Sequence, residues 1–108
     1  MIKYRKASWK DIGGTSFQGY LETTYDKLIK IFGQPHETQG DKTQAEWFFK
    51  FSDGTVASIY DYKEIAPVRS ITEWHIGGNS QRSVIYINAI VNQNYRNLIR
   101  SVFRGKEK

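Results

Sequence analysis

The chain has 108 residues, of which 39% are hydrophobic and 15% aromatic, and its formal net charge is +5. This length predicts one small domain over residues 1–108, with aromatic rings filling much of the core. The chain has no cysteine, which excludes disulfides and thiolate metal sites. It has no apolar run near the roughly 20 residues of a membrane span, and no signal-peptide pattern. We therefore expect a cytoplasmic protein that does not enter a membrane, and its positive charge favours acidic partners.

The first part of the chain predicts one strand and one helix. Residues 1–14 have no clear period, so they are expected to form either a flexible arm or an edge strand. Residues 15–22 predict a short strand, with Phe17 and Leu21 pointing inward. A helix is predicted to begin at one of the two threonines that follow and to end at Gly33. Between these points the apolar residues recur at helical spacing, and a proline follows soon after.

The second part predicts three strands and a long helix. Strands over 44–51 and 56–63 flank an Asp-Gly turn, a pattern typical of a hairpin. A third strand within 71–79 is expected beside them. Apolar residues then keep helical spacing from 81 to about 103, and this helix either breaks near 92–94 or projects towards a partner. The predicted fold is α+β, in the order β-α-β-β-β-α, with an antiparallel sheet and helices on one face.

The third of these strands contains the candidate ligand site. Glu73 and His75 share one face, while Trp74 lies on the other face and is a natural core residue. Gly77 and Gly78 are expected to end the strand in a turn that exposes backbone N–H groups near a helix N-terminus. These groups suit a phosphate or carboxylate, so all five residues are assigned to ligand binding. The alternative is a half-buried strand with a tight exit and no ligand.

Tyr60 and Tyr62 are added to the ligand site, because an aromatic platform on one sheet face can stack bases. The same platform would contain Trp47, Trp74 and His75. The alternative is that these rings form the core and cross-strand pairs. The ribonucleoprotein motifs of base-stacking sheets are absent from the chain, so nucleic acid is not the favoured partner.

Arg96, Arg100 and Arg104 are spaced at i, i+4 and i+8, which predicts a basic ridge on the last helix. They are the candidate partner-binding residues within the basic end 96–108, and a homo-oligomer through this helix is a second use for it. The alternative is a solvated helix face whose charges complement the helix dipole.

Several short stretches of the chain form a recognisable set: Gln18-Gly19-Tyr20, residues 24–28, residues 32–35, Ala45-Glu46-Trp47, residues 53–63 and Thr72-Glu73-Trp74-His75-Ile76-Gly77-Gly78. Together they resemble small, mostly uncharacterised proteins encoded by tailed bacteriophages. The resemblance spans about residues 17–80 and is most specific in the last stretch. It implies a viral origin and expression in the cytoplasm of a bacterial host, but it implies no reaction.

Three functions follow from these patterns. The first is a non-enzymatic binding protein that blocks or sequesters a host component, in particular one of antiviral immunity. The second is a nucleotide-binding sponge protein, whose ligand would lie at the site described above. The third is a small hydrolase in which Glu73 orients His75 as an acid or base. No nucleophile motif, phosphate loop or metal cluster accompanies that pair, so we expect neither an enzyme nor a cofactor.

Overall fold

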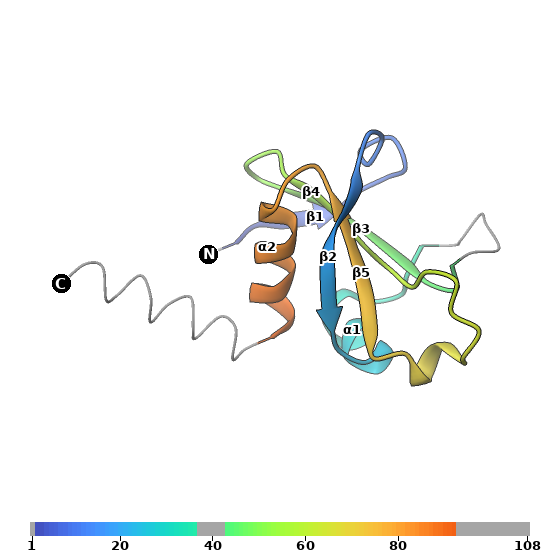
Figure 1. Ribbon diagram of the computed structural model, residues 1–108. Helices are drawn as coiled ribbons and strands as arrows, with labels where there is room; N and C mark the ends of the chain where they lie inside the picture. Colours follow the sequence, from blue (N-terminus) through green and yellow to red (C-terminus); the bar gives the residue numbers. More distant parts are fainter. Residues whose placement is uncertain (1, 37–42, 93–108) are drawn as a thin grey trace.

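A five-stranded antiparallel sheet forms the centre of the structure, a computed structural model that describes residues 2–36 and 43–92. The strands lie in the spatial order β1-β3-β4-β5-β2 (Figure 1). Their bounds are β1 (Tyr4–Lys6), β2 (Ser16–Glu22), β3 (Glu46–Phe51), β4 (Val56–Tyr60) and β5 (Glu73–Gly78). The two α-helices are α1 (Tyr25–Phe32) and α2 (Arg82–Val91), and a short 3-10 helix spans Val68–Ser70. The predicted α+β class is confirmed.

The predicted hairpin of β3 and β4 is confirmed. Gly54 has a φ of 89°, a value that glycine adopts without strain. The Asp53 carboxylate accepts a hydrogen bond of 2.9 Å from the backbone N–H of Thr55, which holds the turn closed. β5 pairs antiparallel with β4 and β2 pairs with the far side of β5, so β2 and the three-residue β1 are the two edges.

Helix α1 has the ends that its sequence predicts. The Thr24 hydroxyl accepts a hydrogen bond of 3.2 Å from the backbone N–H of Lys27, so it is the N-cap. Gly33 follows with a φ of 82°, and its N–H donates to the Ile29 carbonyl. Leu28 and Phe32 are buried against the sheet, so packing stabilises this short helix.

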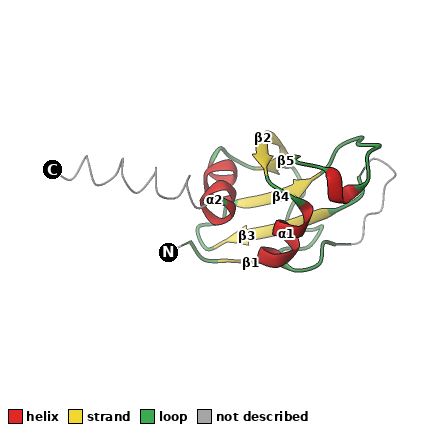
Figure 2. Cartoon of the chain, turned by 90° about the horizontal axis from the view of Figure 1, so that it is seen from below, coloured by secondary structure: helices red, strands yellow, loops and turns green. Residues whose placement is uncertain are grey.

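The core lies between the sheet and the two helices, both of which cover the same face (Figure 2). Trp47 and Trp74 are fully buried there, with their rings 5.7 Å apart. Each indole N–H donates to a backbone carbonyl, Trp47 to Gly33 at 3.0 Å and Trp74 to Thr23 at 3.1 Å. These bonds satisfy the only polar group of each ring, which permits complete burial.

Strand β1 is an element that the predicted order lacks. The structure selects the edge strand over the flexible arm, because β1 pairs antiparallel with β3. The Tyr4 ring packs edge-on against Phe32 and Phe49, at centroid distances of 5.9 and 5.7 Å. With only three residues, all exposed in part, the strand has no alternation that a sequence pattern could detect.

Helix α2 ends at Val91, because Asn92 has extended dihedral angles of −105° and 102°. The two predicted alternatives, a break near 92–94 or a projecting end, both extend beyond Asn92 and so stay predictions. The rest of the predicted helix, including Arg96, Arg100 and Arg104, lies outside the described residues, as does the predicted oligomer contact. Within the two described ranges, no helix is long and apolar enough to cross a membrane.

Candidate functional site

The sheet face opposite the helices, here called the open face, gathers aromatic side chains from several strands. The register places Glu46, Tyr60, His75 and Tyr20 in one row across β3, β4, β5 and β2. A second, neighbouring row contains Phe48, Ser58, Gly77 and Phe17. Because side chains alternate along a strand, these residues point away from the buried tryptophans.

Two small residues make a depression in the middle of this face. A Cβ atom on Gly77 would lie 2.6 Å from the Ser58 hydroxyl oxygen and 3.4 Å from the Tyr60 ring. Above them lies a groove of ≈ 640 Å³, here called the open-face groove. Its main lining residues are Trp9, Phe17, Glu46, Phe48, Tyr60 and Tyr62.

One wall of the groove comes from the loop of residues 7–15, which Figure 1 shows in blue between β1 and β2. The Trp9 ring stands edge-on to Phe48 at a centroid distance of 4.7 Å. Trp9 is 49% exposed whereas Phe48 is only 2% exposed. Phe48 therefore supports the wall, and Trp9 is the ring that a ligand can reach.

His75 lies among four aromatic rings beside the groove. Tyr60 stacks on it at 5.4 Å with an interplanar angle of 21°. The rings of Phe17, Tyr20 and Tyr62 lie within 5.2 to 5.8 Å of it, and together they line a second hollow of ≈ 280 Å³. Three of these rings also line the larger groove, so the two hollows are adjacent parts of one aromatic surface.

Glu46 is the acidic group of the groove. Its side chain is 9% exposed, and Oε1 accepts a hydrogen bond of 2.6 Å from the Thr43 hydroxyl. Oε2 is buried and has no hydrogen-bond partner in the described part of the chain. Burial raises the pKa of Tyr60, its neighbour across the strands, and the charges of Tyr62 and Glu46 add to that rise. An unpaired buried carboxylate oxygen is costly, so this position favours a ligand that donates hydrogen bonds.

Glu73 and His75 share the open face as predicted, but no hydrogen bond between them is found within the described ranges. His75 instead contacts aromatic rings, and its buried Nδ1 has no partner there. Glu73 is exposed and lies opposite Glu22 in the register. Two carboxylates at this end of the face disfavour an anion, which contradicts the predicted phosphate position beside Glu73.

The predicted glycine turn is wrong. Gly77 and Gly78 both lie inside β5, paired with β4 on one side and with β2 on the other. A Cβ atom on Gly78 would lie 2.5 Å from the Cβ of Ser83 and 2.7 Å from the Val56 carbonyl oxygen. Gly78 thus admits α2 close to the sheet, while Gly77 forms the groove floor, and neither presents a turn to a ligand.

The predicted assignment of Trp74 to ligand binding is also wrong, because this side chain is fully buried in the helix-covered core. Trp47 is likewise not part of the predicted aromatic platform, because its side chain is fully buried. Tyr60, Tyr62 and His75 do lie together on the open face, as the predicted platform requires.

Phe17 was expected to point inward, but it is 48% exposed on the open face. The register shifts between Phe17 and Gly19, and this bulge reverses the alternation in β2. Leu21, beyond the bulge, is fully buried. Sequence reasoning thus missed Phe17, and it missed Trp9 because that ring comes from a loop. The strand alternation around Trp47 already placed Glu46 on the opposite face, a signal that could have identified it.

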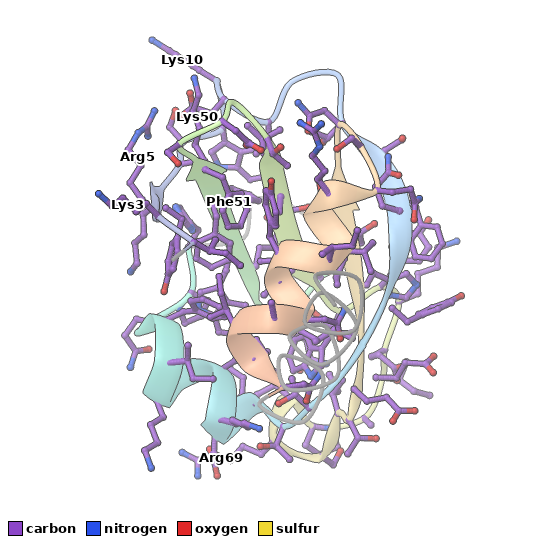
Figure 3. The ribbon with its side chains drawn as sticks, turned by 90° about the vertical axis from the view of Figure 1, so that its left-hand side faces the viewer. Lys3, Arg5, Lys10, Lys50, Phe51 and Arg69 are labelled. Carbon is purple, nitrogen blue, oxygen red and sulfur yellow. The ribbon has the colours of Figure 1, made fainter. Side chains whose placement is uncertain are left out.

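A basic patch lies beside the groove at the β1 edge. Arg5 is opposite Lys50 in the register of β1 and β3, and Figure 3 shows both near Lys3 and Lys10. Asp11 is the acidic residue among them, 3.5 Å from the Arg5 guanidinium and 3.9 Å from the Lys50 ammonium. A hydrogen bond from the Ser8 backbone lowers the pKa of Asp11, and these cations lower it further.

Compared with known protein families, curated proteins and solved structures, the chain matches none. The resemblance to bacteriophage proteins therefore stays a prediction from the sequence.

Proposed function

We propose that the protein is a non-enzymatic binding protein whose open-face groove holds a flat, ring-shaped ligand. The observation that supports this is the convergence of exposed rings on a groove with a small-residue floor. Trp9, Phe17 and Tyr62 are each at least 42% exposed there, on a face that no described helix covers. Exposed apolar side chains that gather in a hollow, with a few polar groups among them, are typical of a binding site.

The phage resemblance supports a host component as the ligand, and sequestration in the bacterial cytoplasm as the action. A counter-defence role would follow if that component serves antiviral immunity. The nucleotide-binding alternative is favoured by the rings themselves, because aromatic side chains stack on bases of any sequence. The hydrolase alternative has less support, since no hydrogen bond within the described ranges orients His75 through Glu73.

The proposal is tested by exposing the protein to a small-molecule extract of bacterial cells and analysing the washed protein by native mass spectrometry. The wild type is compared with Tyr62→Ala in the groove and with Ile85→Ala on α2. Tyr62 and Ile85 are both 42% exposed, so the two truncations are matched in their expected effect on folding. We expect a bound mass that the Ile85 variant keeps and the Tyr62 variant loses.

A second groove variant, Trp9→Ala, should lose the same mass. Thermal melting shows whether each variant is folded before its binding is compared. A ligand that both groove variants retain as well as the wild type would reject the groove as the binding site.

A further inference from the structure

We infer that the ligand of the open-face groove is a guanine base that carries a 5′-phosphate. This inference rests on the proposed function and names the chemistry of its ligand. The base would lie among the rings of the groove with its hydrogen-bonding edge towards Glu46. The phosphate would lie at the basic patch formed by Arg5 and Lys50.

The shape of the groove suits a nucleobase. Ser58 and Gly77 form a low floor between Phe17 and Phe48, which lie three strands apart in one register row. Neighbouring strands are about 4.8 Å apart, so the β3 and β2 backbones that carry Phe48 and Phe17 are roughly 14 Å apart. Trp9 and Tyr62 add exposed ring faces above the floor, and stacking on such rings contributes about 1–3 kcal/mol per base.

Glu46 is the group that would select guanine among the bases. An ionised carboxylate only accepts hydrogen bonds, and it can accept two from adjacent donors. Oε1 already accepts from Thr43 and Oε2 has no partner in the described ranges, so the group has capacity for two more N–H donors. Glu46 lines the groove, but its free oxygen is buried, so the proposed contact requires a rotation about the Cγ–Cδ bond when the ligand binds. Guanine offers two adjacent donors on its pairing edge, whereas adenine and cytosine place an acceptor beside their amino group.

The charge that suits a phosphate lies outside the groove, where Arg5 and Lys50 line a separate hollow and Lys50 is two residues beyond Phe48 on β3. Lys50 is four residues beyond Glu46 on the same face of β3, so their Cα atoms are about 13 Å apart along the strand. A nucleotide with its phosphate is of comparable length. Arg5 lies opposite Lys50 and adds a second cation, although Asp11 contacts both and offsets part of their charge.

The opposite end of the open face is acidic. Glu22 and Glu73 lie opposite one another in the register of β2 and β5, and both are exposed. A phosphate would be repelled at that end and attracted at the β1 edge. The distribution of charge therefore fixes the orientation of the ligand, with its base over β4 and its phosphate over β3 and β1.

The inference is tested by titrating GMP, AMP and guanosine into the full chain while following tryptophan fluorescence. Trp9 is the exposed tryptophan of the groove, and the Trp9→Phe variant identifies its share of the signal. We expect GMP to bind roughly 10- to 100-fold more tightly than AMP, the discrimination typical of one bidentate base contact. Glu46→Gln should remove this preference and leave AMP binding unchanged, because an amide nitrogen opposes the guanine donors.

The phosphate position has its own comparison. Lys50→Ala should weaken GMP binding and leave guanosine binding unchanged, whereas Lys30→Ala on α1 is the matched control and should change neither. Equal affinity for GMP and AMP, or a guanine preference that survives in Glu46→Gln, would overturn the inference. If a cell-extract ligand still requires Trp9 and Tyr62 in that case, the proposed function stands with a different ligand.

The guanine base can belong to a free nucleotide or to a single strand of nucleic acid. A short oligonucleotide with one guanine among adenines separates these two sources. Tighter binding of the oligonucleotide than of GMP assigns the groove to a strand, and equal or weaker binding assigns it to the free nucleotide. A guanine-free oligonucleotide that binds as tightly as the guanine-containing one would overturn the inference.

Discussion

Gly77 and Gly78 are neighbours in β5, but an added methyl group would meet a different obstacle at each. At Gly77 the nearest atom is the Ser58 hydroxyl oxygen, which can rotate away. At Gly78 the nearest atoms include the Ser83 Cβ and the Val56 carbonyl oxygen, which cannot move without shifting α2 or β4. Both positions require glycine for close approach, and both have extended strand backbone rather than a turn.

We expect Gly78→Ala to lower the free energy of unfolding by roughly 1–3 kcal/mol, as overpacking of a closed site does. Gly77→Ala should cost less, and Ser58→Ala in the same chain should recover most of that loss. Urea unfolding of the three single variants and the Gly77/Ser58 double variant measures these differences. Equal costs at the two glycines would contradict the distinction drawn here.

Trp47 and Trp9 show how burial determines the cost of the same substitution. Trp47 is fully buried with its N–H bonded to Gly33, whereas Trp9 is 49% exposed in the groove wall. Trp47→Ala should destabilise the fold by roughly 3–5 kcal/mol, the usual cost of removing a large core aromatic. Trp9→Ala should change stability far less, and denaturant unfolding of both variants tests the contrast. A similar loss in the two variants would show that Trp9 supports the fold instead of a ligand.

At the scale of elements, the Asp53 carboxylate joins the β3–β4 turn to two side chains of α2. The Tyr86 hydroxyl donates a hydrogen bond of 2.6 Å to the Asp53 carboxylate, and Arg82 lies 3.7 Å from the same carboxylate. The hydrogen bond from Tyr86, with those from Thr55, lowers the pKa of Asp53 from 3.8 to about 2. The same contact raises the pKa of Tyr86 above its ordinary value of 10.0.

The sign of the resulting pH dependence follows from these shifts. The lowered pKa of Asp53 stabilises the fold above pH 3.8, and this contribution disappears as the pH falls towards about 2. The raised pKa of Tyr86 stabilises the fold below pH 10.0, and this contribution disappears as the pH rises further. The melting temperature of the wild type should therefore exceed that of Tyr86→Phe by a constant amount near neutral pH. The gap should narrow at both extremes, and a gap independent of pH would show that the contact does not couple to ionisation.

The sequence predicts an element well where neighbouring residues alone specify it. The β3–β4 hairpin and the Gly33 end of α1 follow from patterns of a few neighbouring residues, whereas the N-cap of α1 was left open between Thr23 and Thr24 and is Thr24. Strand β1 is too short for a pattern, and its pairing with β3 depends on residues more than 40 positions away. The bulge at Phe17 depends on the partner strand, so no local period could place that ring on the open face.

At the scale of the whole molecule, the sheet separates a closed face from an open one. Strand alternation alone separates Glu73 and His75 from Trp74, and the two former residues do lie on the open face. The predicted aromatic platform combined Tyr60 and Tyr62 with the buried Trp47 and Trp74. The sequence could not supply Trp9 or Phe17, which reach the groove through a loop and a bulge. It misassigned the two glycines because the strand continues through them, with Gly77 facing Ser58 and Gly78 facing Ser83 of α2. It also assigned Trp74 to the ligand, although strand alternation already placed that side chain on the core face, where it is fully buried. The candidate site therefore forms only in the folded chain, because its residues come from separate strands and a loop.

The distribution of charge over the whole molecule determines how ligand binding should respond to salt. The chain has a formal net charge of +5, the basic patch of Arg5 and Lys50 lies at the β1 edge, and the carboxylates of Glu22 and Glu73 lie at the opposite end of the open face. Lys50 and Arg5 are largely solvated, so salt screens their attraction for a phosphate; the Debye length falls from about 10 Å at 0.1 M to about 3 Å at 1 M. GMP affinity should fall over this range, whereas guanosine affinity should stay constant because stacking and the buried Glu46 contact are little screened. Parallel titrations of both ligands measure this difference. A GMP affinity that does not change with salt would remove the phosphate from the β1 edge and leave only the base in the groove.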